Sequence, residues 1–289
     1  MIKKLVIFGV GLIGGSLAMS LKKANYCNTI IGCSRSVESL QKAQELGVID
    51  DYTLDPIEAV NGADMILLAV PMGAMGSVLQ SIKGHVEAGA VVTDAGSAKA
   101  SVVAAAREVF GEIPPYFVPA HPIAGREKSG VEAAIVDLYA DHKVIVTPLP
   151  ETDAAAEQRV IAMWQATGAD VESMEVEKHD QVLAATSHLP HVLAYSLVDT
   201  LSHSDASDAI FHYAAGGFRD FTRIASSDPV MWRDICLENR DAILASMEEF
   251  QANLQILHQQ VSDADSDGIM ETFTHAKEVR DDYMKKQST

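Results

Sequence analysis

A glycine motif near the N-terminus constrains the fold more than any other feature of the sequence. An apolar run over residues 5–9 leads directly into Gly9-Val10-Gly11-Leu12-Ile13-Gly14, and helical spacing continues from there to residue 24. At this spacing Gly9 permits a tight turn, Gly11 lets the backbone approach a pyrophosphate, and Gly14 lets the helix pack on the strand. The motif predicts a dinucleotide site rather than a merely tight packing turn. Its cofactor-binding residues are predicted to be Gly9, Gly11, Leu12, Ile13 and Gly14.

The rest of the first half continues the alternation of strands and helices. Apolar runs predict buried strands at residues 29–33, 65–70, 90–93, 116–119 and 143–147, and helical spacing predicts helices at 12–24, 37–46, 72–82, 98–110 and 154–167. This alternation is typical of a parallel sheet covered by helices on both faces. We therefore expect an α/β protein, with a Rossmann-like doubly wound sheet over residues 1–172 that binds the dinucleotide.

Residues 173–289 lack further strand-like runs and are predicted to form an all-helical domain. Asp228 and Pro229 suit the cap and first position of a helix, and apolar spacing predicts that this helix continues unbroken to Val261. A last amphipathic segment follows over residues 269–286. Because such long amphipathic helices need an apolar partner, we expect a homodimer through the helical domain, with an extended monomer as the alternative.

Charge and cysteine content narrow the classes of partner. The 289 residues include 22 Lys and Arg against 40 Asp and Glu, a net charge of −18, which disfavours nucleic acid and anionic membranes as partners. Cys27, Cys33 and Cys236 have no paired spacing, so neither a disulfide framework nor a zinc site is expected, and the predicted location is cytoplasmic. No apolar stretch reaches the length of a membrane span.

The end of the second strand bears on the choice of cofactor. In NAD-binding proteins an acidic residue at this position usually binds the ribose hydroxyls, but this sequence has Cys33-Ser34-Arg35. A hydroxyl and a guanidinium suit a 2′-phosphate, so NADP is slightly favoured over NAD, unless Arg35 is only a solvated surface charge. Val70 and Pro71, which end the apolar run at residues 65–70, are also assigned to the cofactor.

Two motifs follow later strands at the same expected edge of the sheet, where ligands bind. The first motif is Thr93-Asp94-Ala95-Gly96-Ser97-Ala98-Lys99. Its Ser97 is a candidate for the functional site, but Ser97 could also be only a helix cap and Asp94 only a hydrogen-bond acceptor in a turn. The second motif is the segment from His121 to Gly130. Its His121 has a titration range that suits a general base, although the sequence is equally compatible with a structural role for this histidine.

The helical half offers groups for an anionic substrate. Ser187-His188-Leu189-Pro190-His191 places two histidines on one helix face, and no metal is expected there because a third ligand is missing. The segment Gly216-Gly217-Phe218-Arg219-Asp220-Phe221-Thr222-Arg223 brings two arginines that suit a carboxylate, or a structural pair of Arg219 with Asp220.

The five motifs GVGLIGGS, TDAGSAK, HPIAGREKSG, SHLPH and GFRDFTRIA, in that order, resemble the prephenate and arogenate dehydrogenase family of tyrosine biosynthesis. The resemblance implies oxidative decarboxylation of prephenate to 4-hydroxyphenylpyruvate, with arogenate as a second substrate and hydride transfer to NAD(P)+. It implies that His121 is the base and Ser97 a second partner of the ring hydroxyl, and that no metal is used. It implies substrate binding by Arg223, His191, His188, Glu127 and Trp232, with Glu127 as a polar gate.

Two other functions fit parts of this pattern. A dehydrogenase of the β-hydroxyacid type shares a nucleotide-binding half and a helical half, but would use a catalytic lysine from the helical part. A non-catalytic dinucleotide sensor would not need His121, Ser97 and Arg223 to converge. The placement of these side chains therefore discriminates between the three.

Overall fold

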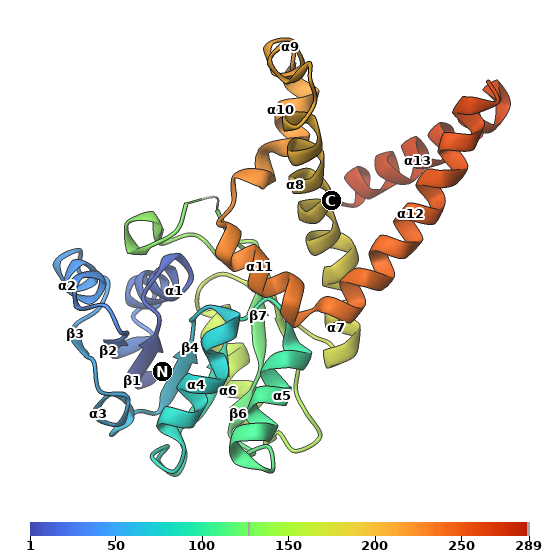
Figure 1. Ribbon diagram of the computed structural model, residues 1–289. Coiled ribbons are helices and arrows are strands. Elements are labelled where there is room, and N and C mark those ends of the chain that lie inside the picture. The colour runs from blue at the N-terminus through green and yellow to red at the C-terminus, as the bar shows by residue number, and fades with distance from the viewer. Residues whose placement is uncertain (127, 288–289) are drawn as a thin grey trace. The chain divides into compact units, whose positions relative to one another are not determined.

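The computed structural model describes residues 1–126 and 128–287 (Figure 1). The chain divides into two compact units, residues 1–240 and 241–289, which are described separately. The strands lie in the first unit, and their bounds are β1 Ile2–Phe8, β2 Cys27–Cys33, β3 Asp51–Thr53, β4 Met65–Leu68, β5 Val91–Asp94, β6 Phe117–Val118, β7 Ala120–Pro122, β8 Lys143–Val146 and β9 Asp170–Ser173.

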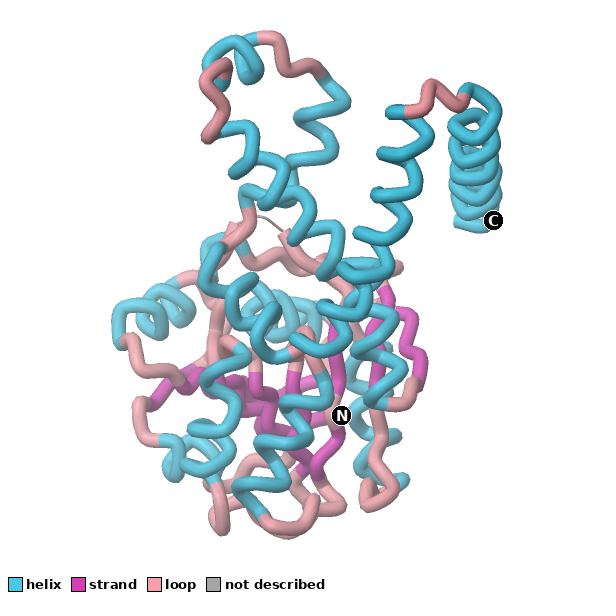
Figure 2. Tube along the Cα trace, turned by 45° about the vertical axis from the view of Figure 1, so that its right-hand side comes forward, coloured by secondary structure: helices cyan, strands magenta, loops and turns pink. Residues whose placement is uncertain are grey.

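The six strands β1 to β6 form one parallel sheet in the order β3-β2-β1-β4-β5-β6. Strand order reverses between β1 and β4, and in open sheets of this kind a ligand binds outside the carboxyl ends of the strands at that point. The predicted doubly wound sheet is confirmed. Figure 2 shows its strands as a layer with helices around it.

The run at residues 143–147 does not join the large sheet. It forms β8, which pairs antiparallel with β7 and parallel with β9 in a separate three-stranded sheet. The strands β3, β7 and β9 were not predicted, because each has only three or four residues and β9 is largely exposed.

Each face of the large sheet carries its own apolar core. Successive side chains of a strand point to opposite faces. Leu5 and Ile7 of β1 belong to one cluster, whereas Val6 and Phe8 belong to the other. The first cluster includes residues of α1 Leu12–Lys23, α2 Val37–Glu45 and α6 Ala154–Gln165; the second includes residues of α3 Pro56–Val60, α4 Met75–Ile82 and α5 Lys99–Phe110. Burial on both faces explains why these strands are continuous apolar runs.

Residues 176–238 are helical and belong to the first unit. Their elements are α7 Val176–Leu183, the π-helical turn η3 Ala184–His188, α8 Leu189–Ser202, α9 Ser207–His212, α10 Gly216–Thr222, the 3₁₀ turn η4 Arg223–Ser226 and α11 Pro229–Glu238. Two further 3₁₀ turns, η1 Met72–Ala74 and η2 Val131–Ala133, connect strands and helices earlier in the chain.

The start of α11 is as predicted, but its length is not. The Asp228 carboxylate accepts hydrogen bonds from the backbone N–H groups of Val230 (2.8 Å) and Met231 (3.1 Å), which confirms the cap. The prediction of one unbroken helix to Val261 is wrong, because Asn239 leaves helical geometry at φ −113° and ψ 33°. Its side-chain amide donates instead to the backbone oxygen of Asp180, 2.9 Å away.

The second unit contains most of α12 Arg240–Ser262, and α13 Ser266–Gln287. Apolar side chains on both helices are exposed, among them Leu254, Ile256, Val261, Met270, Phe273, Val279 and Tyr283. In the part of the chain that the structure describes, no helix combines the length and the apolar character that a membrane crossing requires.

Candidate active site

A cavity of about 630 Å³ opens in the first unit, and it brings most of the predicted site residues together. Its lining includes Gly11, Leu12, Ile13, Val70 and Pro71 from the cofactor group, Ser97 and His121 from the catalytic group, and His188, His191, Arg223 and Trp232 from the substrate group. Gly9, Gly14, Ser34 and Arg35 are not among its lining residues. Glu127, the predicted gate, lies outside the described residues.

The glycine turn after β1 is built for a ligand as well as for tight packing. Gly9 has φ +90°, and a Cβ there would lie 2.4 Å from the oxygen of Ala69. A Cβ on Gly14 would lie 2.4 Å from the oxygen of Gly9, whereas one on Gly11 would meet no atom within 4 Å. Gly9 and Gly14 therefore serve the fold, and Gly11 leaves open space on the cavity side.

The N-terminus of α1 is suited to phosphates. The cap residue Gly11 supplies no side-chain hydrogen bond, and the first turn holds no acidic residue. The positive end of the helix dipole and its N–H groups are thus available to an anion. The residues present fit a dinucleotide: Gly11, Leu12 and Ile13 would hold the pyrophosphate, and Val70 and Pro71 line the same cavity.

Ser34 and Arg35 follow β2 at the same edge of the sheet. The Ser34 hydroxyl accepts a hydrogen bond from the backbone N–H of Ser36 at 3.1 Å, and Arg35 is exposed. Ser36 in turn caps α2 through the N–H of Ser39. The role of Ser34 and Arg35 toward a 2′-phosphate stays a prediction.

A buried ion pair links the segments that carry Ser97 and His121. Lys99 and Asp94 are fully buried and bonded to each other, and the Lys99 ammonium also donates to the oxygen of Ala120 at 2.8 Å. The Asp94 carboxylate accepts from the N–H groups of Gly96 (2.7 Å) and Ala120 (3.2 Å). Asp94 is thus the turn acceptor that the sequence offered as one alternative. Lys99 was missed, although the spacing of Asp94 and Lys99 in one motif could have signalled the pair.

Ser97 lies in the loop that this ion pair shapes. The residue that caps α5 is Ala98, so the interpretation of Ser97 as a helix cap is wrong. The first N–H groups of α5 are occupied instead by the carboxylate of Asp180, at 2.7 Å from Lys99 N and 2.8 Å from Ala100 N. The Ser97 side chain is left on the wall of the cavity.

His121 lies in β7, and a second histidine stands directly behind it. His121 Nδ1 is 2.9 Å from His179 Nε2, and His179 Nδ1 is 2.7 Å from Asp180 Oδ1. Burial, followed by the charges of His179, Lys99 and His188, holds the pKa of His121 well below its usual value. His121 is therefore neutral near pH 7 and able to accept a proton. His179 and Asp180 were not predicted as site residues, because they belong to a segment that resembles a solvated charged helix face, Glu175-Val176-Glu177-Lys178-His179-Asp180.

The two histidines of the SHLPH motif gather around one aromatic ring. His191 stacks on Trp232 with ring centroids 3.6 Å apart and an interplanar angle of 18°, and His188 meets the edge of the same ring at 6.1 Å and 74°. The Asn239 amide lies 3.0 Å from His188 Nδ1, and burial lowers the pKa of His188 to about 4. Burial also lowers the pKa of His191, whose Nδ1 lies 2.9 Å from the oxygen of Ser187.

The arginines of the GFRDFTRIA motif have different places. Both side chains are exposed, but Arg223, which begins η4, lines the cavity, and Arg219 on α10 does not. Arg126 and Lys128 also contribute to the lining. The cavity therefore carries positive side chains in a molecule whose net charge is −18.

Comparisons with known proteins show which family the chain belongs to. Residues 17–173 match the family model of the prephenate dehydrogenase nucleotide-binding domain, and residues 175–275 match that of the prephenate dehydrogenase dimerization domain. A cyclohexadienyl dehydrogenase of Zymomonas mobilis is 38% identical over 96% of this chain and 95% of its own. A prephenate dehydrogenase of Bacillus subtilis is 38% identical over 98% of this chain and 76% of its own.

Solved structures give the same result. The prephenate dehydrogenase of Aquifex aeolicus, in complex with hydroxyphenyl propionate and NAD+, superposes with a TM-score of 0.91 at 37% identity, over 98% of this chain and 99% of that one. An arogenate dehydrogenase of Synechocystis superposes with a TM-score of 0.81 at 25% identity, over 97% and 99%. Both family models match, identities are near 38% along almost the whole chain, and residues of the glycine turn line the same cavity as His121 and Arg223. This chain therefore belongs to the prephenate dehydrogenase family of nicotinamide-dependent oxidoreductases.

Proposed function

We propose that the chain catalyses the oxidative decarboxylation of prephenate to 4-hydroxyphenylpyruvate with NAD(P)+, a step of tyrosine biosynthesis, and that arogenate is a second substrate. One observation carries the proposal: a single cavity is lined by the nucleotide turn, a neutral buried histidine, a serine and an arginine. Positioning dominates such a reaction, because aromatisation of the ring supplies much of the driving force.

Each side chain has a defined task in this scheme. Nε2 of His121 accepts the proton of the ring hydroxyl, and the Ser97 hydroxyl makes a second hydrogen bond to the same oxygen. Arg223 binds a substrate carboxylate, while His191 and Trp232 form an aromatic wall beside it. The bound dinucleotide supplies the acceptor for the hydride that leaves the hydroxyl-bearing carbon. The ring carboxylate leaves as carbon dioxide, its bonding electrons enter the ring, and the resulting phenolate oxygen takes the proton back from His121.

The lining of the cavity disfavours the dehydrogenase of the β-hydroxyacid type. That reaction would take a catalytic lysine from the helical part of the chain. Among the described lining residues, those from the helical part are Leu183, Ser187, His188, His191, Arg223, Ile224, Ser227, Asp228, Val230, Met231, Trp232 and Ile235, and none of these is a lysine. The convergence of Ser97, His121 and Arg223 likewise favours an enzyme over a sensor.

We also propose the domain bounds, the oligomeric state and the cellular location of the protein. The nucleotide-binding domain spans residues 1–172 and the helical domain spans residues 173–289. The junction of the two family models near residue 174 supports this boundary. In the structure, residues 176–240 belong to the first compact unit. The helical domain forms a homodimer. The protein works in the cytoplasm, which is supported by Cys27, Cys33 and Cys236 being free thiols.

A four-way assay tests substrate and cofactor together. Purified protein is mixed with prephenate or arogenate and with NAD+ or NADP+, and absorbance of the reduced nicotinamide is followed. We expect turnover with prephenate, and the ratio of kcat/KM values decides between the cofactors, with Arg35→Ala lowering any preference for NADP+. Folded protein that binds dinucleotide but is silent in all four mixtures would contradict the proposal.

A further inference from the structure

His121 is the first member of a chain of buried contacts that leads away from the cavity. His121 Nδ1 contacts His179 Nε2 at 2.9 Å, and His179 Nδ1 contacts the Asp180 carboxylate at 2.7 Å. That carboxylate is fixed in turn by the N–H groups of Lys99 (2.7 Å) and Ala100 (2.8 Å) at the start of α5. Neither His179 nor Asp180 lines the cavity, so neither is placed to touch the substrate.

Hydrogen-bond chemistry decides where the protons of this chain lie. Burial alone would raise the pKa of Asp180, but hydrogen bonds from His179, Lys99 and Ala100 outweigh it and leave the pKa lowered. Asp180 is therefore an ionised acceptor, and His179 must donate to it through Nδ1–H. Burial lowers the pKa of His179, so its other nitrogen, Nε2, carries a lone pair and accepts a hydrogen bond. His121 must then donate through Nδ1–H, which leaves its Nε2 free to accept.

We propose that His179 and Asp180 are positioning residues that hold His121 in the tautomer with an unprotonated Nε2 directed to the substrate hydroxyl. This inference rests on the proposed function for its consequence in catalysis. The tautomer itself is a property of the protein without substrate, and it can be tested separately.

The described charged groups around the two histidines carry a net negative charge. The charged groups packed against the pair of histidines are Asp94 from β5, Lys99 from α5 and Asp180 from α7, and His188 of η3 is neutral near pH 7. The positive charge of Lys99 is balanced by the negative charge of Asp94, its ion-pair partner. The net charge of these described groups is therefore the negative charge of Asp180. When His121 takes the hydroxyl proton, the positive imidazolium is therefore linked through one neutral ring to a negative carboxylate.

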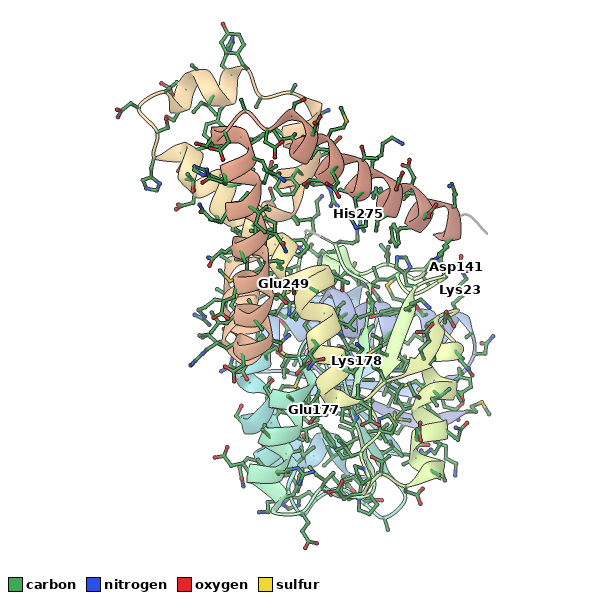
Figure 3. The ribbon with its side chains drawn as sticks, turned by 90° about the vertical axis from the view of Figure 1, so that its right-hand side faces the viewer. Lys23, Asp141, Glu177, Lys178, Glu249 and His275 are labelled. Carbon is green, nitrogen blue, oxygen red and sulfur yellow. The ribbon has the colours of Figure 1, made fainter. Side chains whose placement is uncertain are left out.

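Substitutions on one helix separate this role from a general effect on folding. In Figure 3, Glu177 and Lys178 are labelled on α7; both are exposed, whereas the next two residues, His179 and Asp180, are buried. His179→Phe keeps a ring but removes the acceptor for His121 Nδ1. His179→Gln restores an amide oxygen as acceptor, and Glu177→Gln on the exposed face is the matched control.

Two measurements test the proposal. In ¹⁵N-histidine NMR of the wild-type protein without ligands, we expect His121 to show a protonated Nδ1 and an unprotonated Nε2, and His179→Phe to shift it toward the other tautomer. In steady-state kinetics we expect His179→Phe to lower kcat by about 10²- to 10⁴-fold, as loss of tautomer control does elsewhere. KM and the dinucleotide Kd should change by less than about threefold, His179→Gln should recover part of kcat, and Glu177→Gln should match the wild type.

A wild-type His121 protonated at Nε2 would overturn the proposal, and so would a folded His179→Phe variant with wild-type kcat. If His179→Phe does not fold, the wild-type tautomer and the His179→Gln variant, whose NMR pattern should stay that of the wild type, decide the question. If the wild type shows no turnover with any substrate, the proposed function fails, while the NMR result still confirms or refutes the tautomer.

Discussion

At the scale of single residues, we expect turnover to depend most on His121. It is buried, neutral near pH 7, and lines the same cavity as the nucleotide turn and Arg223. We predict that His121→Asn lowers kcat by about 10²- to 10⁴-fold, the usual contribution of a general base, and leaves the dinucleotide Kd within about twofold. Stopped-flow assays and fluorescence titration with reduced dinucleotide measure the two quantities. Unchanged turnover would refute the assigned base.

Arg223 is expected to act on substrate binding rather than on the chemical step. The Arg223 side chain is exposed at the cavity, and we expect a bound substrate carboxylate to pair with it and bury it. Loss of one partner from such a charge pair costs about 2–4 kcal/mol, which corresponds to a rise in KM of about 30- to 1000-fold for Arg223→Ala. Arg219→Ala is the matched control, because Arg219 comes from the same motif and is likewise exposed, but does not line the cavity. A loss confined to thermal stability, with KM unchanged, would show that Arg223 is structural.

The buried histidines also predict how stability depends on pH. Burial lowers the pKa of His188 from 6.5 to about 4 in the folded protein. The neutral form is thus favoured by folding, so this stabilisation is complete above about pH 6.5 and is lost as the pH falls toward 4. His188 alone should cost about 2 kcal/mol of unfolding free energy between pH 7 and pH 4.5. Urea unfolding at both pH values should show a smaller loss for His188→Gln; an equal loss would contradict the assignment.

At the scale of elements, the glycine turn separates a folding role from a binding role. A Cβ at Gly14 would lie 2.4 Å from the oxygen of Gly9 and 2.7 Å from Ile7 Cγ2, so Gly14→Ala requires the backbone of α1 to move. We predict a loss of about 1–3 kcal/mol in unfolding free energy, as for other overpacked sites. Thermal or urea unfolding measures it, and a variant as stable as the wild type would contradict it.

Gly11→Ala is the complementary change in the same turn. A Cβ there meets no protein atom within 4 Å but projects into the space assigned to the pyrophosphate. The stability should therefore fall by no more than about 1 kcal/mol, the cost of Ala in place of Gly as a cap residue, while the dinucleotide Kd rises at least about tenfold. Calorimetric titration tests this, and an unchanged Kd would show that the turn does not hold the cofactor.

Elements were predictable where their cause is local. The cap of α11 follows from Asp228 and Pro229, which are adjacent, and the strands follow from runs that are buried on both faces. The end of α11 was not predictable, because it depends on Asn239 donating to the backbone oxygen of Asp180, 59 positions away. His179 and Asp180 were missed for the same reason: their partners lie on β7 and α5.

At the scale of the whole molecule, the exposed apolar side chains of α12 and α13 predict self-association. Figure 3 labels the charged Glu249 on α12 and His275 on α13, and the same helices expose Leu254 and Phe273. Residues 175–275 match a dimerization-domain model. Since a monomer rarely leaves so many large apolar side chains in water, we predict a homodimer of about twice 31.0 kDa in light scattering.

Substitution of that surface should dissociate the dimer. Leu254→Glu combined with Phe273→Glu places charge where apolar contact is expected, so the scattering mass should fall to that of one chain, whereas Glu249→Gln should leave it unchanged. Both predicted catalytic residues and Arg223 lie in the first unit, so an inactive but folded monomer would show that the cavity needs the partner subunit. A wild-type chain that remains monomeric at micromolar concentration would instead favour the extended monomer and require another occupant for these helices.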